Sequence, residues 1–301
     1  MEETDLDDAW NLSQRFLWPH RREDRAFLLE LGEGLVAEVD GRVRATIMAF
    51  RYGPALATVG IVIVDKWMQG QGVARELMLD VMARLKGCTI VLQATPSGAS
   101  LYAKLGFEDI GLLYQHQGIA PAAPQPTLSP GERIRSIGSA DSHLATLYSQ
   151  ASCSDRSDLA KALFAQEKGI VLTRDDTPVG FAMLRQFGKG WCIAPVVAID
   201  LNAAKALILH WVAVNTDRFT RVDVAGDEVL SKWLTELGLP QISGTQTMAH
   251  GGLPTSPKAY KVFAVTAHAL GEHKASRRLN LGPGGSHARK CWTGCHCTSC
   301  L

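Results

Sequence analysis

The sequence has no long apolar stretch and no excess of charge of either sign. Its longest apolar runs, such as VGIVIV and ALILHWVAV, are far shorter than the roughly 18 residues that a membrane-spanning helix requires. The chain has 31 Lys and Arg against 30 Asp and Glu, so net charge attracts neither nucleic acid nor an anionic membrane. The acidic start, MEETDLDDAW, lacks the apolar core of a signal peptide. We therefore expect a soluble, cytoplasmic protein that binds neither nucleic acid nor membrane.

Cysteine is scarce outside the C-terminal end. Cys88, Cys153 and Cys192 lie within apolar sequence, which is typical of buried thiols in a reduced protein. Four more cysteines crowd the end of the chain, in the run CWTGCHCTSC. Thiolates and imidazoles bind zinc, but this spacing matches no usual pair of zinc-binding elements and follows a basic, glycine-rich segment. We expect residues 272–301 to form a disordered, cysteine-rich tail, and we expect no required metal.

The chain length of 301 residues indicates about two domains. Residues 119–132, IAPAAPQPTLSPGE, are rich in proline and lack apolar periodicity, so we interpret them as a linker. After the linker the order of the predicted helices and strands starts again. We therefore expect one domain over residues 1–118 and a second over residues 133–271. Each would be a mixed central sheet flanked by helices, which places the chain in the α/β (α+β) class.

Apolar periodicity and turn residues predict the elements of both halves. Asp40-Gly41 is a hairpin signal, and Val59 to Val64 is apolar without alternation, as in a strand covered on both faces. The predicted elements of the first half are helices at 5–17 and 22–31, strands at 34–41, 42–53 and 55–65, a helix at 71–86, a strand at 88–94, a short helix at 97–108 and a strand at 110–118. Those of the second half are a strand at 133–138, helices at 139–151 and 157–169, three strands within 170–200, a helix at 202–215, a strand at 221–226, a helix at 228–239 and a strand at 260–270.

Two glycines, Gly70 and Gly72, follow a buried strand and precede a helix. Free backbone amides at a helix start, approached closely through glycines, are typical of phosphate binding. A P-loop would need Lys and then Ser or Thr after the glycines, where this chain has Val73-Ala74. A dinucleotide-binding turn would need a third glycine, where Arg75 stands, and an acidic residue about 20 positions later, which is missing.

A third interpretation fits the turn better. The run Gln69-Gly70-Gln71-Gly72-Val73-Ala74 resembles the coenzyme A loop of the GNAT family of N-acetyltransferases. Residues 100–111, SLYAKLGFEDIG, resemble a later motif of that family, in which a short helix carries a tyrosine and ends in Leu-Gly-Phe. The predicted order of elements over residues 1–118 also resembles the GNAT core. With its second copy of the plan, the chain resembles tandem GNAT proteins whose C-terminal half is degenerate.

The resemblance implies acetyl-CoA as co-substrate and an amine as acceptor. The amides of Gln71 to Arg75 would bind the pyrophosphate, Gln69 would brace the loop, and the end of the strand would pair with the pantetheine arm as an added strand would. The residues implied in this binding are Val62, Ile63, Val64, Gln69, Gly70, Gln71, Gly72, Val73, Ala74 and Arg75. Tyr102 matches the family's tyrosine near the sulfur, and would act as general acid toward the leaving thiolate.

The general base stays open at this point. Many GNAT relatives carry a carboxylate on the strand leading into the loop, but residues 58–62, TVGIV, contain none. The candidates are a water chain or a residue from elsewhere in the protein, such as His20, Glu38 or Tyr52.

The second half lacks the residues that the resemblance assigns to chemistry. Its segment AIDLNAAKALIL has no glycine pair, and Leu234 stands where Tyr102 would be. We therefore expect it not to bind coenzyme A but to shape an acceptor site between the two copies. The expected acceptor is a small-molecule or protein amine, and the expected assembly is a monomer or a homodimer. The alternative function is a non-catalytic sensor or scaffold that binds acyl-CoA.

Overall fold

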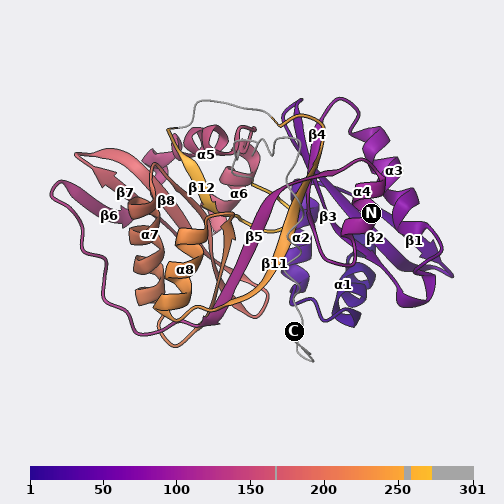
Figure 1. Cartoon of the computed structure of the whole chain (residues 1–301), viewed down its shortest axis with the longest axis horizontal. Coiled ribbons are helices and arrows are strands. Elements are labelled where there is room, and N and C mark those ends of the chain that lie inside the picture. The colour runs from indigo at the N-terminus through magenta and orange to yellow at the C-terminus, as the bar shows by residue number, and fades with distance from the viewer. Residues whose placement is uncertain (167, 254–258, 273–301) are drawn as a thin grey trace, which may run out of the picture.

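The computed structural model describes residues 1–166, 168–253 and 259–272. Two lobes lie side by side and share one sheet, with β5 and β11 running through the middle between them (Figure 1). Nearly all of the predicted cysteine-rich tail, residues 273–301, lies outside the described residues. Within them, no helix has the length and apolar character needed to cross a membrane.

The first half, residues 1–119, follows the predicted order of elements. In chain order these are α1 (Leu6–Arg15), α2 (Arg22–Leu31), β1 (Glu33–Val39), β2 (Arg42–Tyr52), β3 (Leu56–Val64), α3 (Val73–Arg84), β4 (Thr89–Ala94), α4 (Ala99–Lys104) and β5 (Glu108–Ile119). Residues 120–131 contain neither helix nor strand.

The second half, residues 132–272, repeats this plan with an extra strand at each end. Its elements are β6 (Glu132–Ser136), α5 (Leu144–Ser152), α6 (Ser157–Gln166), β7 (Lys168–Arg174), β8 (Thr177–Phe187), β9 (Gly190–Ala198), α7 (Leu201–Val214), β10 (Phe219–Ala225), α8 (Glu228–Leu237), β11 (Gln241–His250) and β12 (Lys261–Ala264). The predicted strand at 260–270 is therefore confirmed only over its first part, and β11 was not predicted.

The hairpin turn at Asp40-Gly41 matches its sequence signal, and a second turn has the same backbone geometry. Asp40 and Gly41 take φ of 52° and 70° between Val39 and Arg42, which pair as the last residues of β1 and the first of β2. Asp175 and Asp176 take φ of 47° and 60° between β7 and β8. Positive φ at both turn positions matches the twist of the flanking strands, and Asp and Gly tolerate it better than other residues.

The two halves exchange strands. The sheet has 12 strands in the order β1-β2-β3-β4-β11-β5-β10-β12-β9-β8-β7-β6. Strand β11 of the second half lies between β4 and β5 of the first, antiparallel to both, and β5 pairs in turn with β10 of the second half. The halves therefore share a continuous backbone hydrogen-bond network in addition to their side-chain contacts.

Helices cover both faces of this sheet. One face packs against α3 and α4 in the first half, around Met78 and Val81, and against α7 and α8 in the second half, around Leu207 and Leu234. The other face carries a core shared by both halves, which includes Leu28 of α2, Tyr148 of α5 and Leu163 of α6. Side chains of both halves therefore meet on this second face.

Candidate active site

Strand β3 bends away from β4 partway along its length. The two strands pair in parallel from Leu56 and Thr89 as far as Val59 and Leu92. Beyond this point Ile61 has a φ of 56°, and the register against β2 shifts between Thr46 and Met48. Left-handed backbone at a β-branched residue is strained, and such strain is often found at functional sites.

The bend opens the sheet between β3 and β4. Val62, Ile63 and Val64 extend past the last residue that pairs with β4, and among the described residues no strand fills the space beside them. An extended ligand can therefore add to this part of β3 as another strand would. The three residues predicted to face the pantetheine arm all lie on this segment.

The glycine turn that follows β3 leaves its backbone open. Gly70 and Gly72 have φ of 77° and 89°, and a Cβ added to either would meet no atom within 4 Å. The amide of Glu76 donates to Gly72 O at 3.0 Å, so the amides before it are the free donors of the helix start. The side chain of Gln69 donates to Val64 O at 2.9 Å and ties the turn to the end of β3. Such a turn at a helix N-terminus suits a pyrophosphate.

The remaining predicted loop residues differ in exposure. Gln71 is exposed and donates to Trp67 O at 2.7 Å. Val73 and Ala74 are half-buried against a small apolar cluster that includes Val64 and Met68, whereas Arg75 is exposed. The apolar first turn therefore seats α3 on the end of β3 and leaves the charged side chain at the surface.

Tyr102 lies on α4 beneath the same face of the sheet as α3. Its side chain is buried, packs against Phe107 with ring centroids 6.0 Å apart, and passes so close to Gly98 that a Cβ there would lie 2.9 Å from the ring. Burial raises the pKa of Tyr102 to about 12, so the phenol is protonated at neutral pH. A protonated phenol in a shielded position has the state that a general acid needs.

The opening between β3 and β4, which we call the gap, has a counterpart between β9 and β10 in the second half, and that counterpart is closed. Strands β9 and β10 pair in parallel only at Trp191 with Thr220 and at Cys192 with Arg221. Beyond these pairs, β12 lies between them, with Val262 opposite Val197 and Ala264 opposite Val224. The second half therefore fills with its own backbone the space that the first half leaves open.

The three residues named as possible bases lie in different surroundings. Glu38 is exposed on β1, the edge strand of the sheet. Tyr52 is buried under the guanidinium of Arg156, which lies 3.4 Å from its ring centre, and burial raises its pKa to about 12. His20 lies in the loop between α1 and α2, where burial and the neighbouring Arg25 hold its pKa well below the usual value. A low pKa makes His20 a weak base.

A charged cluster that the sequence did not predict lies on the shared face of the sheet. The ring of Phe187 lies 4.6 Å from the guanidinium carbon of Arg185, 5.4 Å from that of Arg221 and 5.4 Å from the ring of His20. Asp223 accepts hydrogen bonds from Arg221, the shortest at 2.8 Å. Although burial would raise the pKa of Asp223, Arg221 and His268 hold it far below its usual range.

The same cluster borders the gap between β3 and β4. His268 Nε2 lies 3.1 Å from Arg221 Nη2 and 3.4 Å from Asp223 Oδ2. The next residue, Ala269, packs directly on Gly60: a Cβ added to Gly60 would lie 2.6 Å from the Cβ of Ala269. The carbonyl oxygen of Ala269 also accepts a hydrogen bond of 2.8 Å from the hydroxyl of Thr58. Residues after β12 therefore connect the second half to the point where β3 bends.

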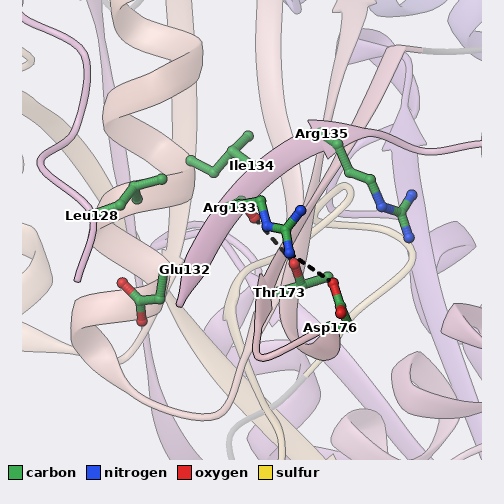
Figure 2. Close-up of a pocket in the computed structure, with 7 residues that line it drawn as sticks. All are labelled: Leu128, Glu132, Arg133, Ile134, Arg135, Thr173 and Asp176. Atoms are coloured by element: carbon green, nitrogen blue, oxygen red, sulfur yellow. Dashed lines mark hydrogen bonds and ion pairs between the residues drawn. The ribbon is translucent and has the colours of Figure 1, made fainter. Parts of the chain in front are cut away.

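A separate pocket lies at the far edge of the second half, between β6 and β7. Figure 2 shows Arg133 pointing toward Asp176, its ion-pair partner at 3.1 Å. The residues that line it are Leu128, Glu132, Arg133, Ile134, Arg135, Thr173 and Asp176. The sheet order places β6 at the opposite edge from β1, well away from the glycine turn, so this pocket is not part of the candidate site.

Comparisons with known proteins agree with the repeated plan. Residues 30–109 and residues 144–264 each match a family model described as an acetyltransferase (GNAT) domain. The chain is 25% identical over 230 residues to the uncharacterized N-acetyltransferase YitH of Bacillus subtilis (strain 168), covering 73% of this chain and 79% of the relative.

Solved structures show the same fold. A putative acetyltransferase from Pyrococcus horikoshii superposes with a TM-score of 0.71 at 20% identity, over 89% of this chain and 93% of the other. A tandem GNAT protein from the clavulanic acid biosynthesis pathway superposes with a TM-score of 0.54 at 13% identity, over 75% and 84% of the two chains.

Proposed function

Because the chain belongs to the GNAT acetyltransferase family and carries two GNAT domains in tandem, we propose that its first domain transfers an acetyl group from acetyl-CoA to a primary amine. The transfer takes place by direct attack, with both substrates bound at once. The observation that supports this assignment most is the contrast between the two halves. The gap beside β3 is open and leads to a glycine turn, whereas the gap beside β9 is filled by β12.

The residues of the first half fit acetyl-CoA. The amides of Gln71 to Arg75 bind the pyrophosphate, and the backbone of Val62 to Val64 pairs with the pantetheine arm. No Cβ stands over Gly70 or Gly72, so the phosphates can approach the backbone closely. Acetyl-CoA supplies the thioester whose carbonyl carbon is attacked.

The chain's own groups handle the protons. The amine nitrogen forms a bond to the carbonyl carbon while the carbon–sulfur bond breaks. Tyr102 donates its phenolic proton to the departing sulfur, and the proton lost by the amine passes to a base or to water. The raised pKa of Tyr102 keeps that proton in place until it is needed.

Release of free thiol from acetyl-CoA across a panel of small and peptide amines tests this function. We expect release with at least one amine, together with one bound coenzyme A per chain by titration calorimetry, because only the first half has an open gap. Tight coenzyme A binding without thiol release for any amine would contradict turnover. That result would favour the alternative of a non-catalytic acyl-CoA sensor or scaffold.

A further inference from the structure

Arg25 is a fully buried cation whose guanidinium group has no hydrogen-bond partner among the described residues. It lies on α2, three residues before the core residue Leu28, and its side chain has no exposed surface. None of its three guanidinium nitrogens makes a hydrogen bond within the structure. Burial lowers its pKa to about 10, which still leaves it charged at neutral pH. An ion buried without partners is costly, so a group that pairs with Arg25 would gain a large interaction.

The nearest carboxylate does not fill this role. Asp24 is adjacent in sequence, but its oxygens accept from Arg21 and from the backbone amide of Gly188. These bonds fasten the loop before α2 to the turn between β8 and β9, and so hold the two halves together. Asp24 thus acts on Arg25 through its negative charge alone and accepts no hydrogen bond from the guanidinium group.

Arg25 belongs to a group of cationic and imidazole side chains contributed by both halves. We define the basic cluster as His20, Arg25, Arg185, Arg221 and His268. Burial lowers the pKa of His20 most, and the charges of the other four side chains lower it further, that of Arg25 more than the rest. Two more buried atoms in this cluster lack partners, His20 Nδ1 and Arg185 Nε. Asp24 pairs with Arg21 and Asp223 pairs with Arg221, so Arg25 and Arg185 have no ion-pair partner among the described residues.

The basic cluster is linked through His268 to the strand that ends at the glycine turn. The side chain of His268 is 28% exposed, whereas Asp223 beneath it is buried. Ala269, the next residue, packs against Gly60 where β3 bends away from β4. His268 and Ala269 therefore connect the charged side chains around Arg221 to the point where β3 bends away from β4.

We propose that the basic cluster binds a carboxylate of the acceptor, so that the substrate is an amine that also carries a carboxylate group. The planar fork of a guanidinium matches a carboxylate with two parallel hydrogen bonds, and the negative charge of the carboxylate offsets part of the excess positive charge. The amine of the same molecule then points toward the gap beside β3. This inference rests on the proposed function and names the substrate class for it.

Thiol release with matched amine pairs tests the substrate class. The panel pairs α-amino acids and 4-aminobutanoate with their carboxamides, and adds 3-aminopropylphosphonate. We expect the wild type to favour a carboxylate over its amide by at least about tenfold in kcat/KM, one strong charge-assisted pair being large enough for this. Arg25→Gln should bring this ratio close to one, because it should lower kcat/KM for the carboxylate far more than for the amide. A preference for the amides or for the phosphonate would overturn the assignment.

A neighbouring arginine provides the control. Arg22 lies on the same helix but is exposed and paired with Asp7, so Arg22→Gln should leave the carboxylate preference unchanged. Arg25→Lys, which retains the charge but loses the fork, should keep only part of the preference. Equal loss with the carboxylate and the amide in Arg25→Gln would point to a structural role and contradict the proposal.

Binding of a product analogue separates this inference from turnover. 4-Acetamidobutanoate has no free amine and needs no catalysis to bind. It should raise the melting temperature of the wild type but not of Arg25→Gln, and 4-acetamidobutanamide should raise neither. Such a result with an inactive protein would support the carboxylate site while contradicting the proposed function. Thiol release without carboxylate preference, and without stabilisation by the analogue, would support the function and overturn the site.

Discussion

At the scale of single residues, Tyr102 is the side chain on which the proposed chemistry depends. Replacing it by Phe removes the proton donor and keeps the packing against Phe107. We expect kcat to fall by about 10²–10⁴-fold, with little change in the KM for acetyl-CoA. Burial raises the pKa of Tyr102 to about 12, so the wild-type kcat should show no alkaline loss from this group below about pH 11.

Steady-state kinetics between pH 6 and 10 check this expectation. Tyr114→Phe on β5 makes the same chemical change outside the site and should retain full activity. Unchanged kcat in Tyr102→Phe would exclude Tyr102 as the acid.

Gly72 and Gly87 offer a matched pair of substitutions. Both have positive φ, 89° and 92°, and an added Cβ would meet no atom within 4 Å at either. Changing either to Ala should therefore lower the free energy of unfolding by a similar amount, about 1–2 kcal/mol. Only Gly72→Ala places a methyl group over the amides at the start of α3, so only this variant should weaken coenzyme A binding.

Urea unfolding and titration calorimetry of the two variants check the comparison. Equal affinities for coenzyme A in Gly72→Ala and Gly87→Ala would show that the turn does not contact the ligand.

At the scale of elements, His116 connects a strand of the first half to a helix of the second. It is buried on β5, with Nδ1 2.9 Å from Leu239 O and Nε2 2.8 Å from the hydroxyl of Ser231. Burial lowers its pKa below the ordinary value. The unfolded chain therefore binds a proton more readily than the folded one, and the stability that depends on neutral His116 is present above about pH 6.5 and lost as pH falls through the folded pKa.

Urea unfolding at pH 5, 6 and 7 measures this dependence. His116→Gln should make the fall in unfolding free energy toward pH 5 shallower, by up to about 1.4 kcal/mol per pH unit. The exposed His143 provides the control, because His143→Gln should leave the slope unchanged. A slope equal to that of the wild type in His116→Gln would contradict the assignment.

Local signals explain which elements the sequence predicted. Asp40-Gly41 and the apolar spacing along α3 act within a few residues, and the predicted hairpin and helix are confirmed. Strand β11 was missed because its outer part, around Gly244, is polar and its partners belong to the other half. The basic cluster was missed for a similar reason, although Arg25 within the apolar stripe of α2 and His268 within an apolar run were visible irregularities.

At the scale of the whole molecule, the exchanged strands make the two halves one folding unit. A fragment of residues 1–131 lacks β11, so β4 loses its antiparallel partner and β5 loses both neighbours. We expect this fragment to be largely unfolded or aggregated, because unpaired strands expose backbone donors and acceptors. Co-expression with residues 132–301, which supply β10 and β11, should restore a soluble complex.

Circular dichroism and size-exclusion chromatography of the fragment provide the measurement. A monomeric fragment with a cooperative unfolding transition would contradict this view. Because deletion of the second half is expected to unfold the first, the role of the second half is better tested by substitutions.

The position of β11 also has a consequence for synthesis on the ribosome. Strand β4 ends at Ala94, but β11 begins only at Gln241. At roughly 5–20 residues per second, β4 leaves the ribosome about 7–30 s before the strand that completes its hydrogen bonding. During that interval the nascent chain exposes an apolar strand edge, IVLQA, to solvent or to a chaperone. The interleaved sheet thus delays completion of the first half until nearly the whole chain has been translated.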